Sequence, residues 1–143
     1  MCYEPKTLAF ILKRLADGGV FIDVGANIGG YTIRAAKTAR VYALEPHPCN
    51  FHLLKLNVKL NQKQNNVRAF QTAAGLYLGK AKLAISNYHG RHSLLYSQVK
   101  MQRKCHSTIE VDVMTLDSIL ANEDHIDVIK IDVEGAERSK EGA

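Results

Sequence analysis

Residues 20–46 constrain the fold of this 143-residue chain more strongly than any other stretch. An apolar run at residues 20–24 is followed by a glycine-rich turn, a segment of helical spacing at residues 28–39, and a second apolar run at residues 41–44. Strands buried on both faces of a parallel sheet have this nearly continuous apolar character. The stretch therefore predicts an α/β fold, with a parallel core sheet and helices on both faces.

The turn in this unit reads GANIGG at residues 25–30. Glycine is expected there because the backbone takes a positive φ or approaches a ligand closely. Asn27 stands where a dinucleotide-binding turn has its second glycine, which leaves room for a smaller anion such as the carboxylate of S-adenosylmethionine. Glu45, twenty residues after Gly25, can accept hydrogen bonds from both hydroxyls of a ribose. There are two alternatives to S-adenosylmethionine binding at this turn. One is a tight strand-to-helix connection that binds no ligand, and the other is a nicotinamide-dependent dehydrogenase.

Two acids, Asp132 and Glu134, follow the apolar run at residues 126–131, which predicts another buried strand with Lys130 inside it. The carboxyl ends of parallel strands border one crevice, so these acids are expected beside the glycine turn. There they would orient substrate hydroxyls, accept a proton or hold a divalent ion. Alternatively, they are acids favoured by the dipole at a helix amino end. Asp23 lies inside an apolar run and is costly unless it is paired or lies at the open end of its strand.

Helical and strand patterns alternate along the rest of the chain. Residues 1–19 are expected to hold a helix at residues 4–17 that leads into the sheet and ends at Gly18-Gly19. We further expect a helix at residues 51–60, strands at residues 67–74, 81–86 and 108–113, a short helix capped by Thr115 and reaching Leu120, and an irregular basic loop at residues 87–107.

The size and composition are those of one ordinary globular domain spanning residues 1–143, with 46% hydrophobic and 23% charged residues. No apolar run reaches the ~18 residues of a membrane span, and the amino-terminal stretch lacks the features of a signal peptide. The three cysteines form no CxxC pair, so neither structural zinc nor a disulfide framework is expected. We therefore predict a cytoplasmic protein without a membrane segment, and we assign no residue as a metal ligand.

Four motifs occur in a characteristic order: FIDVGANIGGYT, ALEPHP, TLDSIL and IDVIKIDVEGAE. Together they resemble the FkbM family of S-adenosylmethionine-dependent methyltransferases, over about residues 3–137. The resemblance implies a Rossmann-like class I methyltransferase fold. It also implies O-methylation of a hydroxyl group on a sugar or another small molecule. Because the family pattern continues beyond the last motif, we expect the carboxyl-terminal strands of the sheet to be missing from this chain.

The resemblance also implies roles for individual residues. The residues around the methionine part of the cofactor would be Asp23, Gly25 and Asn27, with Gly29 and Tyr31 close by. Glu45 would hold the ribose with Pro46 beside it, and Thr72 and Ala73 would border the adenine. The catalytic candidates near the transferred methyl group would be Asp132, as general base, and Glu134 as second choice.

The distribution of charge leaves the acceptor open. Residues 46–109 contain ten Lys or Arg and no Asp or Glu, and Lys55, Lys59 and Lys63 repeat along one predicted helix. These bases either face a phosphate-rich partner or cover a solvated surface, and the lack of interleaved aromatic residues favours the solvated surface. An RNA methyltransferase is therefore an alternative to a small-molecule or glycan O-methyltransferase, and a cofactor-binding module without activity is another. An unpaired sheet edge would allow a homo-oligomer.

Overall fold

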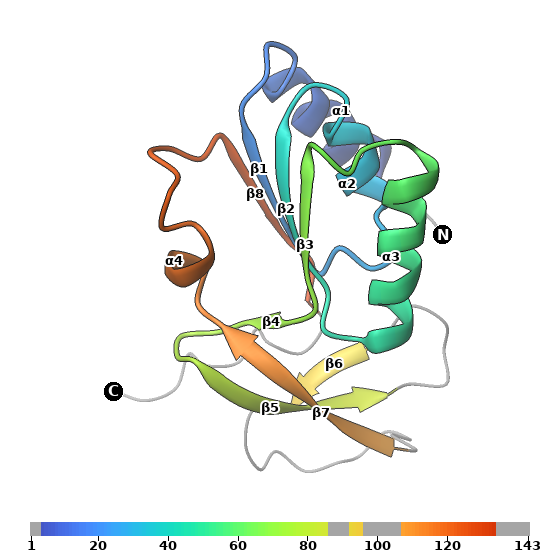
Figure 1. Cartoon of the computed structure of the whole chain (residues 1–143), viewed down its shortest axis with the longest axis vertical. Coiled ribbons are helices and arrows are strands. Elements are labelled where there is room, and N and C mark those ends of the chain that lie inside the picture. Colours follow the sequence, from blue (N-terminus) through green and yellow to red (C-terminus); the bar gives the residue numbers. More distant parts are fainter. Residues whose placement is uncertain (1–3, 86–91, 96–106, 134–143) are drawn as a thin grey trace.

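The computed structural model describes residues 4–85, 92–95 and 107–133. Within them the chain forms two four-stranded sheets (Figure 1). The first sheet is entirely parallel and contains, in spatial order, β3 (Val67–Phe70), β2 (Arg40–Leu44), β1 (Val20–Val24) and β8 (Val128–Ile131). The predicted α/β fold with a parallel core is confirmed.

Helices cover both faces of this sheet. One face carries α1 (Pro5–Arg14), α2 (Gly30–Ala35) and α3 (Pro48–Leu60), and the other carries α4 (Leu116–Ile119) (Figure 1). The first helix is shorter than the predicted residues 4–17, and the chain then turns into β1 through Gly18 and Gly19, at φ 100° and 122°. Thr115 caps α4 as predicted, because its Oγ1 accepts a hydrogen bond from the Ser118 N–H over 3.2 Å.

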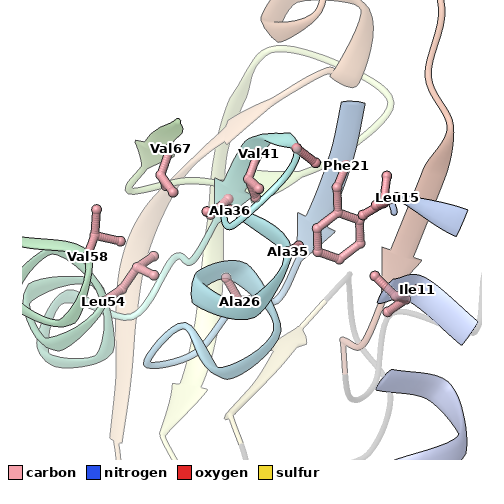
Figure 2. Close-up of a cluster of buried hydrophobic side chains, with 12 residues drawn as sticks. Ile11, Leu15, Phe21, Ala26, Ala35, Ala36, Val41, Leu54, Val58 and Val67 are labelled. Carbon is pink, nitrogen blue, oxygen red and sulfur yellow. The ribbon is translucent and has the colours of Figure 1, made fainter. Parts of the chain in front are cut away.

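The main hydrophobic core lies between the first sheet and the layer of α1, α2 and α3 (Figure 2). Alanines dominate the sheet-facing side of the α2 region, and such small side chains let the helix approach the strands closely. Larger side chains from the strands and from α1 and α3 fill the remaining volume. The cluster includes Ile11, Leu15, Phe21, Ala35, Ala36, Ala39, Val41, Leu54 and Val58.

The second sheet departs most from the sequence prediction. It contains β4 (Ala73–Ala74), β7 (Ser107–Met114), β5 (Gly79–Ile85) and β6 (His92–Leu95), with β5 antiparallel to both β6 and β7. The prediction of a single strand at residues 67–74 is wrong, because this segment forms β3 and β4. It divides between the two sheets at Thr72, whose hydroxyl donates to the Asp112 carbonyl over 3.0 Å and so holds the chain against β7.

The irregular loop predicted at residues 87–107 is also wrong in part. Residues 92–95 form β6 and Ser107 begins β7, because both segments find backbone partners on β5 that lie far away in sequence. The rest of that predicted loop lies outside the described residues.

Two apolar segments expose several large side chains, and one of them is β8, which was predicted to be buried. Ile129 and Ile131 of β8 are 46% and 65% exposed, because the described residues of α4 cover β1 and β2 rather than β8. On α3, Leu53, Leu56 and Leu60 face solvent, and only the stripe formed by Leu54 and Val58 is buried.

No helix in the described part of the chain is long and apolar enough to cross a bilayer. The predicted cytoplasmic location and the predicted homo-oligomer stay predictions.

Candidate functional site

The carboxyl ends of β1, β2 and β8 meet at one edge of the first sheet. Val24 is in register with Leu44 on one side and with Ile131 on the other. The chain leaving β1 therefore enters the glycine turn directly between the segments that follow β2 and β8. This arrangement brings Glu45 and Asp132 to opposite sides of the turn, at the sheet edge where the sequence predicted both acids.

Gly25 occupies the tightest point of this edge. Its φ is 77°, and a Cβ on it would lie 2.2 Å from the carbonyl oxygen of Asp132. The N–H groups of Gly25 and Ala26 both donate to the Leu44 carbonyl over 3.0 Å, and the Asp132 N–H donates to the Val24 carbonyl over 3.0 Å. The turn is thus pinned from both neighbouring strands, which requires glycine at this position.

The next residues of the turn also take left-handed backbone conformations. Asn27 has φ 55° and Gly29 has φ 93°, and α2 begins directly after Gly29. Asn tolerates this region better than most residues with a Cβ, which explains how it stands in place of a second glycine. At Gly29 a Cβ would lie 2.7 Å from Cδ1 of Leu54, so glycine here also lets α3 pack against the turn.

Glu45 is a buried carboxylate that holds the turn to the end of β2. Its Oε2 accepts a hydrogen bond from the Asn27 N–H over 2.8 Å, and its Oε1 accepts one from the His47 N–H over 2.9 Å. Burial raises the pKa of Glu45, and the hydrogen bonds from His47 and Asn27 oppose that rise. A hydrogen bond from the Asn50 side chain also opposes the rise, so a further donor to this carboxylate would share or replace that contact.

Asp23 is fully buried and is paired, which is one of the two conditions that its sequence context required. Its Oδ2 accepts a hydrogen bond from the Thr32 hydroxyl over 2.7 Å, and its Oδ1 lies 2.9 Å from Nζ of Lys130. Both carboxylate oxygens are therefore engaged inside the protein. Asp23 thus links β1 to Thr32 of α2 and to Lys130 of β8.

Lys130 is the site residue that sequence reasoning missed. Its side chain is only 11% exposed, and its Nζ lies 2.9 Å from Asp23, 3.9 Å from Oδ2 of Asp132 and 4.9 Å from the ring centroid of Tyr31. The available signal was a lysine inside one apolar strand and an acid inside another. In the parallel register of β1 and β8, Asp23 and Lys130 are direct partners.

The remaining predicted site residues differ in their accessibility. Asp132 exposes 71% of its side chain at the sheet edge, whereas Thr72 and Ala73 are buried where the chain passes between the two sheets. Tyr31 and Pro46 are half-buried, and Glu134 lies outside the described residues. Among the described residues, no three His, Cys, Asp or Glu side chains are grouped so that they could hold a metal ion.

A parallel sheet in the order β3-β2-β1-β8, with a glycine turn after β1 and an acid after β2, defines a Rossmann-like domain of the class that binds nucleoside-containing cofactors. The sequence profile of the methyltransferase FkbM domain matches residues 23–139, and the chain belongs to this family. S-adenosylmethionine is the cofactor of these methyltransferases.

Curated relatives agree with this membership. Methyltransferase 1 of Beauveria bassiana is 29% identical over an alignment of 144 positions, which covers 85% of this chain and 56% of that protein. Methyltransferase sdnD of Sordaria araneosa is 26% identical over an alignment of 166 positions, which covers 95% of this chain and 61% of that protein. The chain thus spans little more than half the length of these two relatives.

A third relative is similar over a shorter region. The tRNA(Phe) (4-demethylwyosine(37)-C(7)) aminocarboxypropyltransferase of Methanocaldococcus jannaschii is 43% identical over 67 residues. These residues cover 45% of this chain and 25% of that protein.

Proposed function

We propose that this domain binds S-adenosylmethionine at the carboxyl edge of the first sheet and transfers its methyl group to a hydroxyl of a sugar or another small molecule. The observation that carries the proposal is the buried Glu45 carboxylate, bonded to the backbone of the glycine turn over 2.8 Å. This contact holds the carboxylate, a suitable acceptor for ribose hydroxyls, next to the glycine turn. Gly25 and Gly29 leave no room for a side chain in that turn, so its backbone stays bare.

The residues at this edge suit the parts of the cofactor. Glu45 accepts hydrogen bonds from the two ribose hydroxyls, with Pro46 alongside, and the ribose shares or replaces the contact from the Asn50 side chain. Gly25, Asn27, Gly29 and Tyr31 surround the methionine part, where the bare backbone of the turn allows close approach. Thr72 and Ala73 border the adenine from the chain that follows β3.

When bound, S-adenosylmethionine supplies an electrophilic methyl carbon that is attached to a sulfonium sulfur. The acceptor oxygen would bond to this carbon while the carbon–sulfur bond breaks, and the sulfonium would leave as a neutral thioether. The protein holds the two reactants together and in line, which is mainly a proximity effect. The acceptor hydroxyl must also lose its proton, and Asp132 is the proposed general base because its carboxylate is exposed at the edge. Glu134 is the second candidate for this role.

Calorimetric titration with S-adenosylmethionine, followed by transfer of a labelled methyl group to pools of sugars and small hydroxylated metabolites, tests the proposal. Binding followed by label in a hydroxylated acceptor is the expected result. Binding without transfer to any pool supports a cofactor-binding module instead. A folded protein that binds no S-adenosylmethionine contradicts both.

RNA is the second candidate acceptor. The observation that favours it is the identity of 43% over 67 residues with an enzyme named for its action on tRNA. Lys55 and Lys59 are exposed on α3, and no acid in the described part of the chain forms an ion pair with either of them. Binding to tRNA that falls steeply as salt rises supports this candidate, because phosphate contacts release counterions. Absent or salt-insensitive binding contradicts it.

A further inference from the structure

We propose that Lys130 binds the carboxylate at the amino-acid end of S-adenosylmethionine, and that Asp23 holds the lysine in place for this task. The inference rests on the proposed function and adds a cofactor contact to the same site. It also separates the roles of two charged residues, since Asp23 then acts through Lys130 instead of touching the cofactor.

Lys130 has more hydrogen-bond donors than its contacts with the described residues use. An ammonium group has three N–H donors and no acceptor. One donor is used at 2.9 Å from Oδ1 of Asp23, and the 3.9 Å to Oδ2 of Asp132 is too long for a hydrogen bond. Within the described residues, the other two donors of this nearly buried cation have no acceptor. Buried donors are normally satisfied, so an acceptor from a ligand is expected here.

The position of Lys130 also favours a contact with the amino-acid end of the cofactor. Lys130 extends from β8 toward the carboxyl edge of the sheet, where its Nζ lies 4.9 Å from the ring centroid of Tyr31 in the first turn of α2. The same Nζ lies near Asp132, whose carbonyl oxygen lies against the glycine turn. The unused donors are thus beside the glycine turn, where the methionine part of the cofactor is proposed to lie.

The burial of the charged pair formed by Asp23 and Lys130 also favours a role in ligand binding. A buried ion pair is often no more stabilising than apolar residues of similar volume, so stability alone is a weak reason for this one. Thr32 fixes Asp23 from the other side over 2.7 Å, which leaves the aspartate as a rigid anchor for the ammonium group. A preorganised cation is what recognition of a carboxylate requires, since charge-assisted hydrogen bonds are the strong ones.

Calorimetry with two cofactor analogues tests this contact without any activity measurement. S-adenosylhomocysteine carries the amino-acid end, whereas methylthioadenosine has the same nucleoside and thioether without it. We expect Lys130→Met to weaken S-adenosylhomocysteine binding by about tenfold or more, with methylthioadenosine affinity changed by less than about twofold. Glu45→Ala is the matched control, because loss of the ribose contact should weaken both analogues.

An equal loss for both analogues in Lys130→Met would mean that the lysine only supports the fold, and an unchanged affinity for S-adenosylhomocysteine would mean that it does not touch the ligand. Either result overturns the inference. If Lys130→Met fails to fold, Asp23→Asn combined with Lys130→Met removes both buried charges, and the same selective loss is expected. A folded wild-type protein that binds neither analogue contradicts the proposed function itself, which distinguishes the two failures.

Discussion

The backbone N–H of Asn27 donates a hydrogen bond to Oε2 of Glu45 over 2.8 Å, and this contact joins the glycine turn to the end of β2. The two residues are 18 positions apart in sequence. Asn27 takes a left-handed conformation, at φ 55°, while its N–H donates to this carboxylate. The groups that would meet the amino-acid end and the ribose of the cofactor are therefore held as one unit before any ligand arrives.

Replacement of Glu45 by alanine should weaken S-adenosylmethionine binding by about tenfold or more, because hydrogen bonds to a charged group are strong. It should also lower the stability of the fold, since the N–H groups of Asn27 and His47 lose their acceptor. Calorimetry measures the first effect and thermal unfolding the second. Wild-type affinity in a folded Glu45→Ala protein would remove the ribose assignment.

Stability and cofactor affinity should respond oppositely to pH at Glu45. Burial raises the pKa of this carboxyl above its ordinary value of 4.5. Its contribution to stability is therefore fully present below 4.5 and is lost as the pH rises through the raised pKa. Compared with Glu45→Gln, the wild-type protein should lose stability over that window in denaturant titrations. Its S-adenosylmethionine affinity should rise over the same window, because the ionised carboxylate accepts ribose hydroxyls better. Parallel pH curves for the two proteins would contradict this prediction.

Gly25→Ala should destabilise the fold by about 2 kcal/mol or more, because the residue has a positive φ and its new Cβ would meet a backbone oxygen. The new Cβ would lie 2.2 Å from the carbonyl oxygen of Asp132. Gly79→Ala is the control, since a Cβ at that position meets nothing within 4 Å. Urea denaturation of the two variants should separate them clearly, and equal stability would show that the turn relaxes without strain.

Asp23→Ala should cost about 3–5 kcal/mol, because it leaves the ammonium group of Lys130 buried without its partner. The double variant Asp23→Asn with Lys130→Met removes both charges and should unfold at a higher denaturant concentration than Asp23→Ala. Chemical denaturation monitored by circular dichroism measures both. A double variant less stable than Asp23→Ala would contradict this prediction. It would show that the main cost of Asp23→Ala is not the unpaired charge of Lys130.

The unit from β1 to Glu45 follows from the sequence because its signals are local. The mostly apolar runs at residues 20–24 and 41–44 reflect burial on both faces, and Gly25 and Gly29 take positive φ values in the turn. Family membership and the cofactor follow from the same motifs. The position of Asp132 beside the turn also follows, since the edge of a parallel sheet is shared by all of its strands.

The tertiary structure alone decided which distant residues meet. Asp23 and Lys130 are 107 positions apart, and only the register between β1 and β8 makes them partners. The division of residues 67–74 between two sheets depends on the Asp112 carbonyl of β7, and the exposure of Ile129 depends on where α4 packs. Local periodicity records which side chains prefer burial, but strand pairing and coverage depend on partners far away in the chain. For that reason the sequence defined the glycine turn and its acid, and the fold added the lysine beneath them.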